Sequence, residues 1–372
     1  MTNLRIPGPT PCPDDVLQAM SRQMINHRGP EFATILKRVT SNLQTLFQTK
    51  NDVLILTSGG TGAMEAMVVN FLSPGDHVIV VSIGVFGDRF AQICETYGAR
   101  VTKLSFPLGE AADPAQLDAA LAANPDVKAV LVTHNETSTG VTNDLEALAA
   151  VINKHGKLSI VDAISSLGSI RLPVDEWGLD VVGTGSQKGW MVPPGLAMVS
   201  VSERAWKAYE TARMPRFYFD LKKAKDFFDK GQTPWTPAIS VFFALDVALQ
   251  RLVEEGIDRI VARHQRIADL ARAGVESLGL ELLVKNPAWR SNTVTAIVVP
   301  EGVDGPAVSK LLREEYDVVI GGGQGPLTGK IWRLGHLGYC TEADIEDALA
   351  KMKLALERVG FSASGVGAVT GG

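Results

Sequence analysis

The fold of this chain is decided by the run Val181-Val182-Gly183-Thr184-Gly185-Ser186-Gln187-Lys188. Its apolar start predicts a buried strand, which small residues break just before the lysine. Upstream, a second apolar strand, Leu158 to Val161, ends in Asp162. Open α/β sheets bind ligands at the carboxyl ends of parallel strands, so we expect Asp162 and Lys188 to face one crevice.

A lysine amine and a lone carboxylate in such a crevice suit one chemistry in particular. Lys188 can form a Schiff base with pyridoxal phosphate, while Asp162 pairs with the pyridine nitrogen of that cofactor. Taken singly, each residue has a simpler interpretation, because acids and lysines at strand ends often cap the next helix or face solvent. Further elements along the chain decide between the two interpretations.

A glycine-rich turn, Thr57-Ser58-Gly59-Gly60-Thr61-Gly62, follows an apolar strand and opens a helical pattern. Glycines allow an anion to approach closely and the free amides of a helix start attract it, so the turn predicts a phosphate site. The turn could instead hold the nucleotide of a short-chain dehydrogenase, since a Tyr-x-x-x-Lys pattern exists at Tyr218 and Lys222. That interpretation is weaker, because the turn lies far from the N-terminus and the second strand runs into Ser82 rather than an acid.

Short apolar strands alternate with helical patterns over the first half of the chain, which predicts an α/β fold with a mostly parallel sheet covered on both faces. The expected strands are 53–56, 77–81, 129–132, 158–161, 180–182 and 197–201, and 145–154 is one of the intervening helices. A helix over 240–255 then ends at Gly256. A second unit follows, with strands 293–299 and 330–334 and helices 305–315 and 342–359.

These patterns divide the chain into four parts. We expect an N-terminal arm (1–15), a large domain (16–255), a smaller C-terminal α/β domain (256–360) and a disordered tail (361–372). The tail consists mostly of small residues and glycine, which provide too little apolar surface to pack.

The composition is typical of a globular enzyme. The chain has 372 residues, a net charge of −5 and 45% hydrophobic residues, which gives no electrostatic case for nucleic acid. No apolar stretch is long enough to span a bilayer, and the N-terminus lacks the apolar core of a signal peptide. Cys12, Cys94 and Cys340 are scattered without metal-ligand spacing, which favours a cytoplasmic location, unpaired thiols and no metal site.

Taken together, the motifs resemble the class V aminotransferases of fold type I, in the alanine–glyoxylate and serine–glyoxylate branch. The resemblance runs from Pro7 to about Val359. Besides the runs already quoted, it rests on Pro7-Gly8-Pro9-Thr10, His27-Arg28-Gly29-Pro30-Glu31-Phe32, Gly84-Val85-Phe86-Gly87, His134-Asn135-Glu136-Thr137-Ser138-Thr139-Gly140, Thr233-Pro234-Trp235-Thr236-Pro237 and Lys330-Ile331-Trp332-Arg333-Leu334-Gly335. It implies a seven-stranded sheet in the large domain, a ping-pong Schiff-base mechanism and a homodimer with shared active sites.

The resemblance also implies a role for each matched residue. Asp162 and Lys188 are expected to be catalytic, and Arg333 and Gly8 to bind the substrate. The expected ligands of pyridoxal phosphate are Gly59, Gly60 and Thr61 at the phosphate turn, Phe86 stacked on the ring, Thr137 at the ring oxygen, Asp162, Gln187, Lys188 and, from the neighbouring subunit, Thr236. Two positions depart from some members of the family, since Phe86 replaces a tryptophan and Thr61 replaces a histidine.

The matched arginine limits which amino acids we expect as the donor. Only Arg333 stands at a carboxylate-binding position, so a dicarboxylic donor would leave a charge uncompensated in a desolvated pocket. We therefore predict transfer from alanine or serine to glyoxylate, giving glycine and a 2-oxoacid. Alternatives are another donor of the same class, aspartate or 2-aminoethylphosphonate with pyruvate, and an inactive subunit retained as a structural partner. Cysteine desulfurase chemistry is disfavoured, because the loop before Arg333 has no cysteine and Cys340 follows it.

Overall fold

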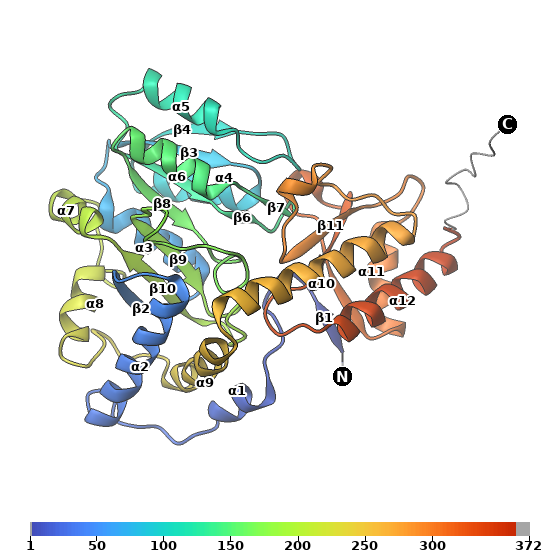
Figure 1. The fold of residues 1–372 in the computed structure, drawn as a ribbon, viewed down its shortest axis with the longest axis horizontal. Coiled ribbons are helices and arrows are strands. Elements are labelled where there is room, and N and C mark those ends of the chain that lie inside the picture. Colours follow the sequence, from blue (N-terminus) through green and yellow to red (C-terminus); the bar gives the residue numbers. More distant parts are fainter. Residues whose placement is uncertain (1, 362–372) are drawn as a thin grey trace.

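A computed structural model describes residues 2–361, which form one seven-stranded and one four-stranded sheet with helices packed around them (Figure 1). Helices of the first half and centre are α1 (Asp14–Ala19), α2 (Pro30–Phe47), α3 (Gly60–Phe71), α4 (Val85–Thr96), α5 (Pro114–Ala123), α6 (Leu145–Lys154), α7 (Glu203–Thr211), α8 (Leu221–Phe228) and α9 (Ile239–Glu255). Helices α10 (Ile257–Ser277), α11 (Gly305–Glu315) and α12 (Glu342–Arg358) follow, with short 3₁₀ turns at Pro287–Trp289 and Gly325–Leu327.

The large sheet has the strand order β2-β10-β9-β8-β5-β3-β4. Its strands are β2 (Asp52–Ser58), β3 (His77–Ser82), β4 (Arg100–Ser105), β5 (Ala129–Thr133), β8 (Leu158–Asp162), β9 (Val181–Gly185) and β10 (Gly195–Val201). Only β10 runs antiparallel to its neighbours, while β9, β8, β5, β3 and β4 are parallel. The predicted α/β class and mostly parallel seven-stranded sheet are therefore confirmed.

Both faces of this sheet are buried, because successive strand residues point to opposite sides. Along β3, Ile79 and Val81 belong to the core formed with α1, α2, α5, α6 and α9, whereas Val78 and Val80 belong to the core formed with α3, α4, α7 and α8. Continuous apolar runs are what a sheet covered on both faces requires. This covering leaves the strand ends as the places where polar side chains can meet a ligand.

The second sheet has the order β1-β12-β13-β11 and packs against α10, α11 and α12, at the right of Figure 1. Its strands are β1 (Asn3–Arg5), β11 (Val294–Val298), β12 (Val318–Gly322) and β13 (Ile331–Gly335). Strand β1 pairs in parallel with β12, so the N-terminal segment adds to a sheet built almost entirely from the C-terminal part of the chain. The arm is thereby anchored close to the place where the two sheets meet.

The strands and helices named from sequence are present, and their bounds differ by at most three residues, with the largest difference at the end of β9. Of the strands in these two sheets, β1, β4 and β12 were not predicted. β4 mixes exposed and partly buried residues at a sheet edge, and β12 runs directly into the glycines at 321–323, so neither shows a continuous apolar run. The expected domain limits are not tested by these elements and stay predictions; the α9–α10 break does fall at Gly256, whose φ is +79°. Of the expected tail, residues 362–372 lie outside the described range.

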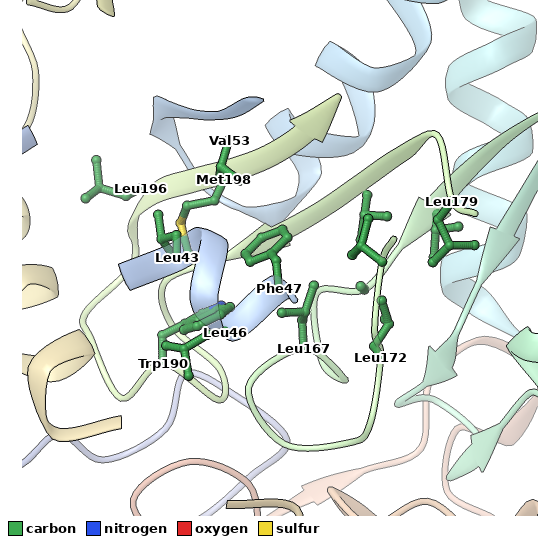
Figure 2. Packing of buried hydrophobic residues seen from close by; sticks show 14 of the residues in the cluster. Leu43, Leu46, Phe47, Val53, Leu167, Leu172, Leu179, Trp190, Leu196 and Met198 are labelled. Atoms are coloured by element: carbon green, nitrogen blue, oxygen red, sulfur yellow. The ribbon is translucent and has the colours of Figure 1, made fainter. Parts of the chain in front are cut away.

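An apolar cluster under the Lys188 loop fixes that loop to the body of the protein (Figure 2). Trp190 is fully buried and stacks on Phe47 of α2, with ring centroids 5.8 Å apart. Its indole nitrogen donates to Thr184 Oγ1 at 3.0 Å, which ties the residues after Lys188 back to β9. This packing gives the loop a fixed conformation although it lies outside regular structure.

Between residues 2 and 361, none of the helices combines the length and apolar character that crossing a bilayer requires.

Candidate functional site

A cavity of about 120 Å³ opens at the carboxyl ends of the parallel strands. Its walls bring together most of the residues singled out from sequence, and they are Gly60, Thr61, Phe86, Arg89, Asn135, Thr137, Asp162, Ile164, Ser165, Gln187 and Lys188. A wider groove of about 900 Å³ lies at the opposite ends of the strands, beside Asp52, Asp180 and Val201. That groove contains none of the predicted site residues, so the smaller cavity is the better candidate.

Asp162 is the last residue of β8 and is buried beneath the cavity. Its Oδ1 accepts a hydrogen bond from the Ile164 amide at 2.9 Å, and its Oδ2 lies 3.4 Å from the hydroxyl of Thr133. Burial raises the pKa of Asp162 to about 7, and the nearby carboxylate of Glu136 adds to the rise. A cationic partner within the cavity would reverse this shift and keep the carboxylate ionised.

Lys188 follows β9 and points toward the N-terminal arm. Its Nζ donates to the carbonyl of Pro7 at 2.5 Å, and a Cβ placed on Gly8 would lie 2.5 Å from the same nitrogen. Burial lowers the pKa of Lys188 to about 8, and the positive charge of Arg333 adds to the effect. The amine is therefore closer to its nucleophilic, neutral form than an exposed lysine.

The predicted phosphate turn is the start of α3. Strand β2 ends at Ser58 and the helix begins at Gly60, so Gly59 alone forms the turn and offers no side-chain cap. The first amides of the helix thus remain free to bind an anion. A Cβ on Gly185, at the end of β9, would come within 3.1 Å of the Gly60 nitrogen, which shows why a glycine is needed there.

Gln187 completes this end of the cavity. Its Oε1 is buried and meets no hydrogen-bond partner among residues 2–361, so the amide keeps unused capacity. An unpaired buried acceptor is costly, and only a group that donates a hydrogen bond to Oε1 removes that cost.

Two charged residues of the site were missed from sequence. Arg89, on α4, lies with its guanidinium 4.7 Å above the Phe86 ring and donates to Thr61 Oγ1 at 3.3 Å. Glu136 is buried, and its Oε2 accepts from the amides of Phe86 and Gly87 at 3.0 and 3.1 Å. Glu136 therefore caps the start of α4 and fixes the aromatic ring that faces the cavity. Burial raises the pKa of Glu136.

Arg333 lies just outside the cavity wall, on β13 of the second sheet. Its Nε donates to the Gly322 carbonyl at 2.7 Å and its Nη1 to the Thr137 carbonyl at 3.0 Å, with Gln324 Oε1 3.4 Å away. No described residue accepts from Nη2 at hydrogen-bond distance, so one arm of the fork is free for a ligand. Burial lowers the pKa of Arg333, yet an arginine stays charged in a protein.

Other predicted positions fall outside the cavity of a single chain. Thr236 is exposed and does not line it. The dehydrogenase pattern is also remote from it, since Lys222 pairs with Asp226 on α8 and Tyr218 is exposed. Cys340 is buried, and burial raises the pKa of its thiol to about 11, which does not suit a reactive nucleophile.

The residues present fit pyridoxal phosphate. A helix start with free amides faces one end of the cavity, the ring of Phe86 forms one wall, and Asp162 and Lys188 lie at or just after the ends of two neighbouring strands. This donor set matches a phosphate, an aromatic ring, a ring nitrogen and an aldehyde. The individual residue roles remain predictions.

Comparison with known proteins gives a consistent assignment. The aminotransferase class-V family model matches residues 2–346. The soluble hydrogenase small subunit of Synechococcus sp. is 46% identical, and the match covers 96% of this chain and 94% of that protein. The L-aspartate–glyoxylate aminotransferase of Paracoccus denitrificans is 38% identical, with 96% and 91% covered. The serine–glyoxylate aminotransferase of Hyphomicrobium methylovorum is also 38% identical, with 98% and 93% covered.

Among solved structures, the alanine–glyoxylate aminotransferase of Nostoc sp. superimposes with a TM-score of 0.92. It is 32% identical, and the match covers 95% of each chain.

Proposed function

This chain belongs to the class V aminotransferases, a family of pyridoxal phosphate-dependent enzymes of fold type I, and we propose that it transfers the amino group of alanine or serine to glyoxylate. The matches confirm the family, the fold type and the cofactor that the sequence motifs indicated. Glycine and the 2-oxoacid of the donor would be the products. The donor and the residue roles are the parts that we propose.

Bound pyridoxal phosphate supplies an electron sink for the donor carbon that loses its proton. Asp162 holds the proton of the ring nitrogen, since a carboxylate and a cation about 4 Å apart attract by roughly 4 kcal/mol at an effective dielectric near 20. The free amine of Lys188 would take the proton from the donor Cα as a general base and pass it on as a general acid. Its lowered pKa of about 8 suits a base that works near neutral pH.

The free arm of Arg333 is the observation that carries the donor proposal. Two of its nitrogens are held by backbone carbonyls of Gly322 and Thr137, which leaves Nη2 for the α-carboxylate of one amino acid. The other arginine of the site, Arg89, donates to Thr61 at the phosphate end. A donor with a second carboxylate therefore has no unengaged arginine beside Arg333 and would bear a desolvation cost.

A panel of donors with glyoxylate as acceptor tests this proposal. We expect alanine or serine to exceed aspartate in kcat/KM by about tenfold or more, the selectivity that an uncompensated carboxylate implies. Glycine formation is the readout, and 2-aminoethylphosphonate is assayed in parallel with pyruvate through alanine formation. The proposal is wrong if aspartate or 2-aminoethylphosphonate clearly exceeds both alanine and serine. Aspartate is the serious rival, because the Paracoccus relative is named for it.

A second candidate is a subunit that serves a larger complex without catalysis. The 46% identity to a protein named as a hydrogenase small subunit favours it. Against it, the candidate cofactor residues Asp162 and Lys188 lie around one cavity with Arg333 beside it. An absorbance scan of the purified protein separates the candidates, because a visible band from lysine-bound cofactor, together with turnover, excludes an inert subunit.

We also propose a homodimer and a cytoplasmic location. The exposed Thr236 is the residue we expect to reach the phosphate of the neighbouring subunit, which makes each site complete only in the dimer. The location rests on three free cysteines, Cys12, Cys94 and Cys340, which suit a reducing compartment.

A further inference from the structure

Arg89 is a cation of the cavity without an ionic partner in the described part of the chain. The residue is half-buried on α4, and none of the ion pairs among residues 2–361 includes it. Its neighbour Asp88 is engaged elsewhere, with Lys103 and the hydroxyl of Ser82. A half-buried guanidinium that lines a cavity and faces no carboxylate is suited to an anionic ligand.

The contacts of Arg89 place its charge at the phosphate end of the cavity. Its Nη1 donates to Thr61 Oγ1 at 3.3 Å, and Thr61 lies in the first turn of α3, beside the free amides of that helix. The guanidinium also lies 4.7 Å from the centre of the Phe86 ring, which restricts where the side chain can move. The two contacts hold the fork near the helix start before any ligand arrives.

The charges around the cavity indicate which ligand group the Arg89 guanidinium can bind. A phosphate monoester carries close to two negative charges at neutral pH. The other groups at that end, the amides of α3 and the side chains of Thr61 and Gln187, are neutral. The other two cations near the cavity are already engaged, because Lys188 donates to Pro7 and Arg333 donates to Gly322 and Thr137. Arg89 is the cation that this chain offers to the phosphate.

We propose that Arg89 is a cofactor-binding residue that pairs with the phosphate of pyridoxal phosphate, held ready by the Thr61 hydroxyl and the Phe86 ring. The inference rests on the cofactor dependence of the family and does not depend on which amino acid is the donor. A planar guanidinium can donate two parallel hydrogen bonds to a phosphate, which a lysine cannot do. Arg89 thereby supplies a positive charge to the phosphate beside Thr61, the position at which some family members have a histidine.

Two cofactor forms isolate the phosphate contribution. Dissociation constants of pyridoxal phosphate and of pyridoxal, which has no phosphate, are measured by absorbance on protein from which the cofactor has been removed. For Arg89→Gln we expect the pyridoxal phosphate constant to rise about tenfold to a hundredfold, the range for a hydrogen bond to a charged group. The pyridoxal constant should stay unchanged. Arg89→Lys should recover part of the loss, because the charge returns without the fork.

A matched control and competing roles make the test decisive. The matched control is Arg171→Gln. Arg171 is an exposed arginine whose guanidinium lies 5.8 Å from the Trp177 ring. Its replacement removes the same charge at a site remote from the cavity and should leave both dissociation constants unchanged. The proposal is overturned if Arg89→Gln weakens both cofactor forms equally, which means that Arg89 only positions Phe86. It is also overturned if neither constant changes and the KM for aspartate rises instead. Because no donor enters the binding measurement, failure of the donor proposal leaves this test intact.

Discussion

The amine of Lys188 donates a 2.5 Å hydrogen bond to the carbonyl of Pro7, a residue near the N-terminus. Pro7 follows β1 of the four-stranded sheet, and Lys188 follows β9 of the seven-stranded sheet. This hydrogen bond therefore connects the N-terminal segment to the loop after β9. Gly8 lies against the same side chain, where a Cβ would overlap the lysine. These contacts hold Lys188 in a defined, buried position.

Replacing Lys188 with alanine should abolish both turnover and the visible band of lysine-bound cofactor while the fold survives. The side chain lies on a loop and contributes little apolar packing, so we expect a stability change of about 1 kcal/mol or less. Lys157→Ala is the matched control, since Lys157 also donates to a proline carbonyl, that of Pro125, but on the exposed surface. A visible band that persists in Lys188→Ala shows that another lysine holds the cofactor.

The lowered pKa of Lys188 predicts how capture of the cofactor depends on pH. The neutral amine is the form that reacts, and with a pKa of about 8 roughly one tenth of the lysines are neutral at pH 7. The capture rate of cofactor-free protein should thus rise with pH up to about 8 and then level off. A free lysine derivative, with its ordinary pKa near 10.4, should keep rising over the same range and serves as the reference. Parallel pH profiles for protein and derivative contradict the shift.

Parts of this site follow from sequence because they are local. The run that ends in Lys188 and the strand that ends in Asp162 each carry their own apolar pattern, and parallel pairing of β8 with β9 brings their ends together. Arg89 and Glu136 had no such signal. Their positions depend on how α4 packs beside α3 and on the turn after β6 (Asn135–Glu136), which are tertiary contacts.

The edge strand β4 escaped prediction for a different reason. Its residues Arg100 to Ser105 are a mixture of exposed and partly buried side chains, so the segment lacks the apolar run that marks the central strands. Its two apolar residues, Val101 and Leu104, are three positions apart, so the segment has no period-two pattern either. The contact between Lys188 and Pro7 has no sequence signal at all, because it depends on β1 joining a sheet formed by the far end of the chain.

The Asp162→Asn variant should keep the cofactor but lose most of its rate. An amide cannot supply the charge that holds the ring nitrogen protonated, and removal of an attraction of roughly 4 kcal/mol corresponds to about a thousandfold in rate. Cofactor content by absorbance and single-turnover loss of the donor Cα proton are the two measurements. Wild-type single-turnover rates in the variant mean that Asp162 has a different task.

Assembly is open to a separate test through Thr236. If this hydroxyl reaches the phosphate of the neighbouring subunit, cofactor retention should fall when dilution separates the dimer. Thr236→Ala should weaken cofactor binding about tenfold to a hundredfold, which a lost hydrogen bond to a charged group implies, without changing the sedimentation coefficient. Thr34→Ala, at an exposed hydroxyl that bonds only within α2, is the control. Sedimentation of an active, cofactor-loaded monomer rules out the shared site.

Arg333 offers the clearest separation between binding of the donor and binding of the cofactor. The guanidinium is held by the carbonyls of Gly322 and Thr137 through Nε and Nη1, so a lysine at this position cannot keep both contacts and also reach a carboxylate. We expect Arg333→Lys to raise the KM for alanine and for glyoxylate about tenfold to a hundredfold, the range for a lost charge-assisted hydrogen bond.

The cofactor should be unaffected by this change, because Arg333 lies outside the cavity wall that the cofactor residues form. Its dissociation constant and absorbance band are therefore the internal control. Arg272→Lys is a matched variant, since Arg272 is also a buried arginine that donates to a backbone carbonyl, that of Ser291, in the same half of the molecule. If Arg333→Lys and Arg272→Lys both keep the wild-type KM values for alanine and glyoxylate, the substrate carboxylate binds elsewhere. If only the cofactor constant rises, Arg333 belongs to the cofactor site instead.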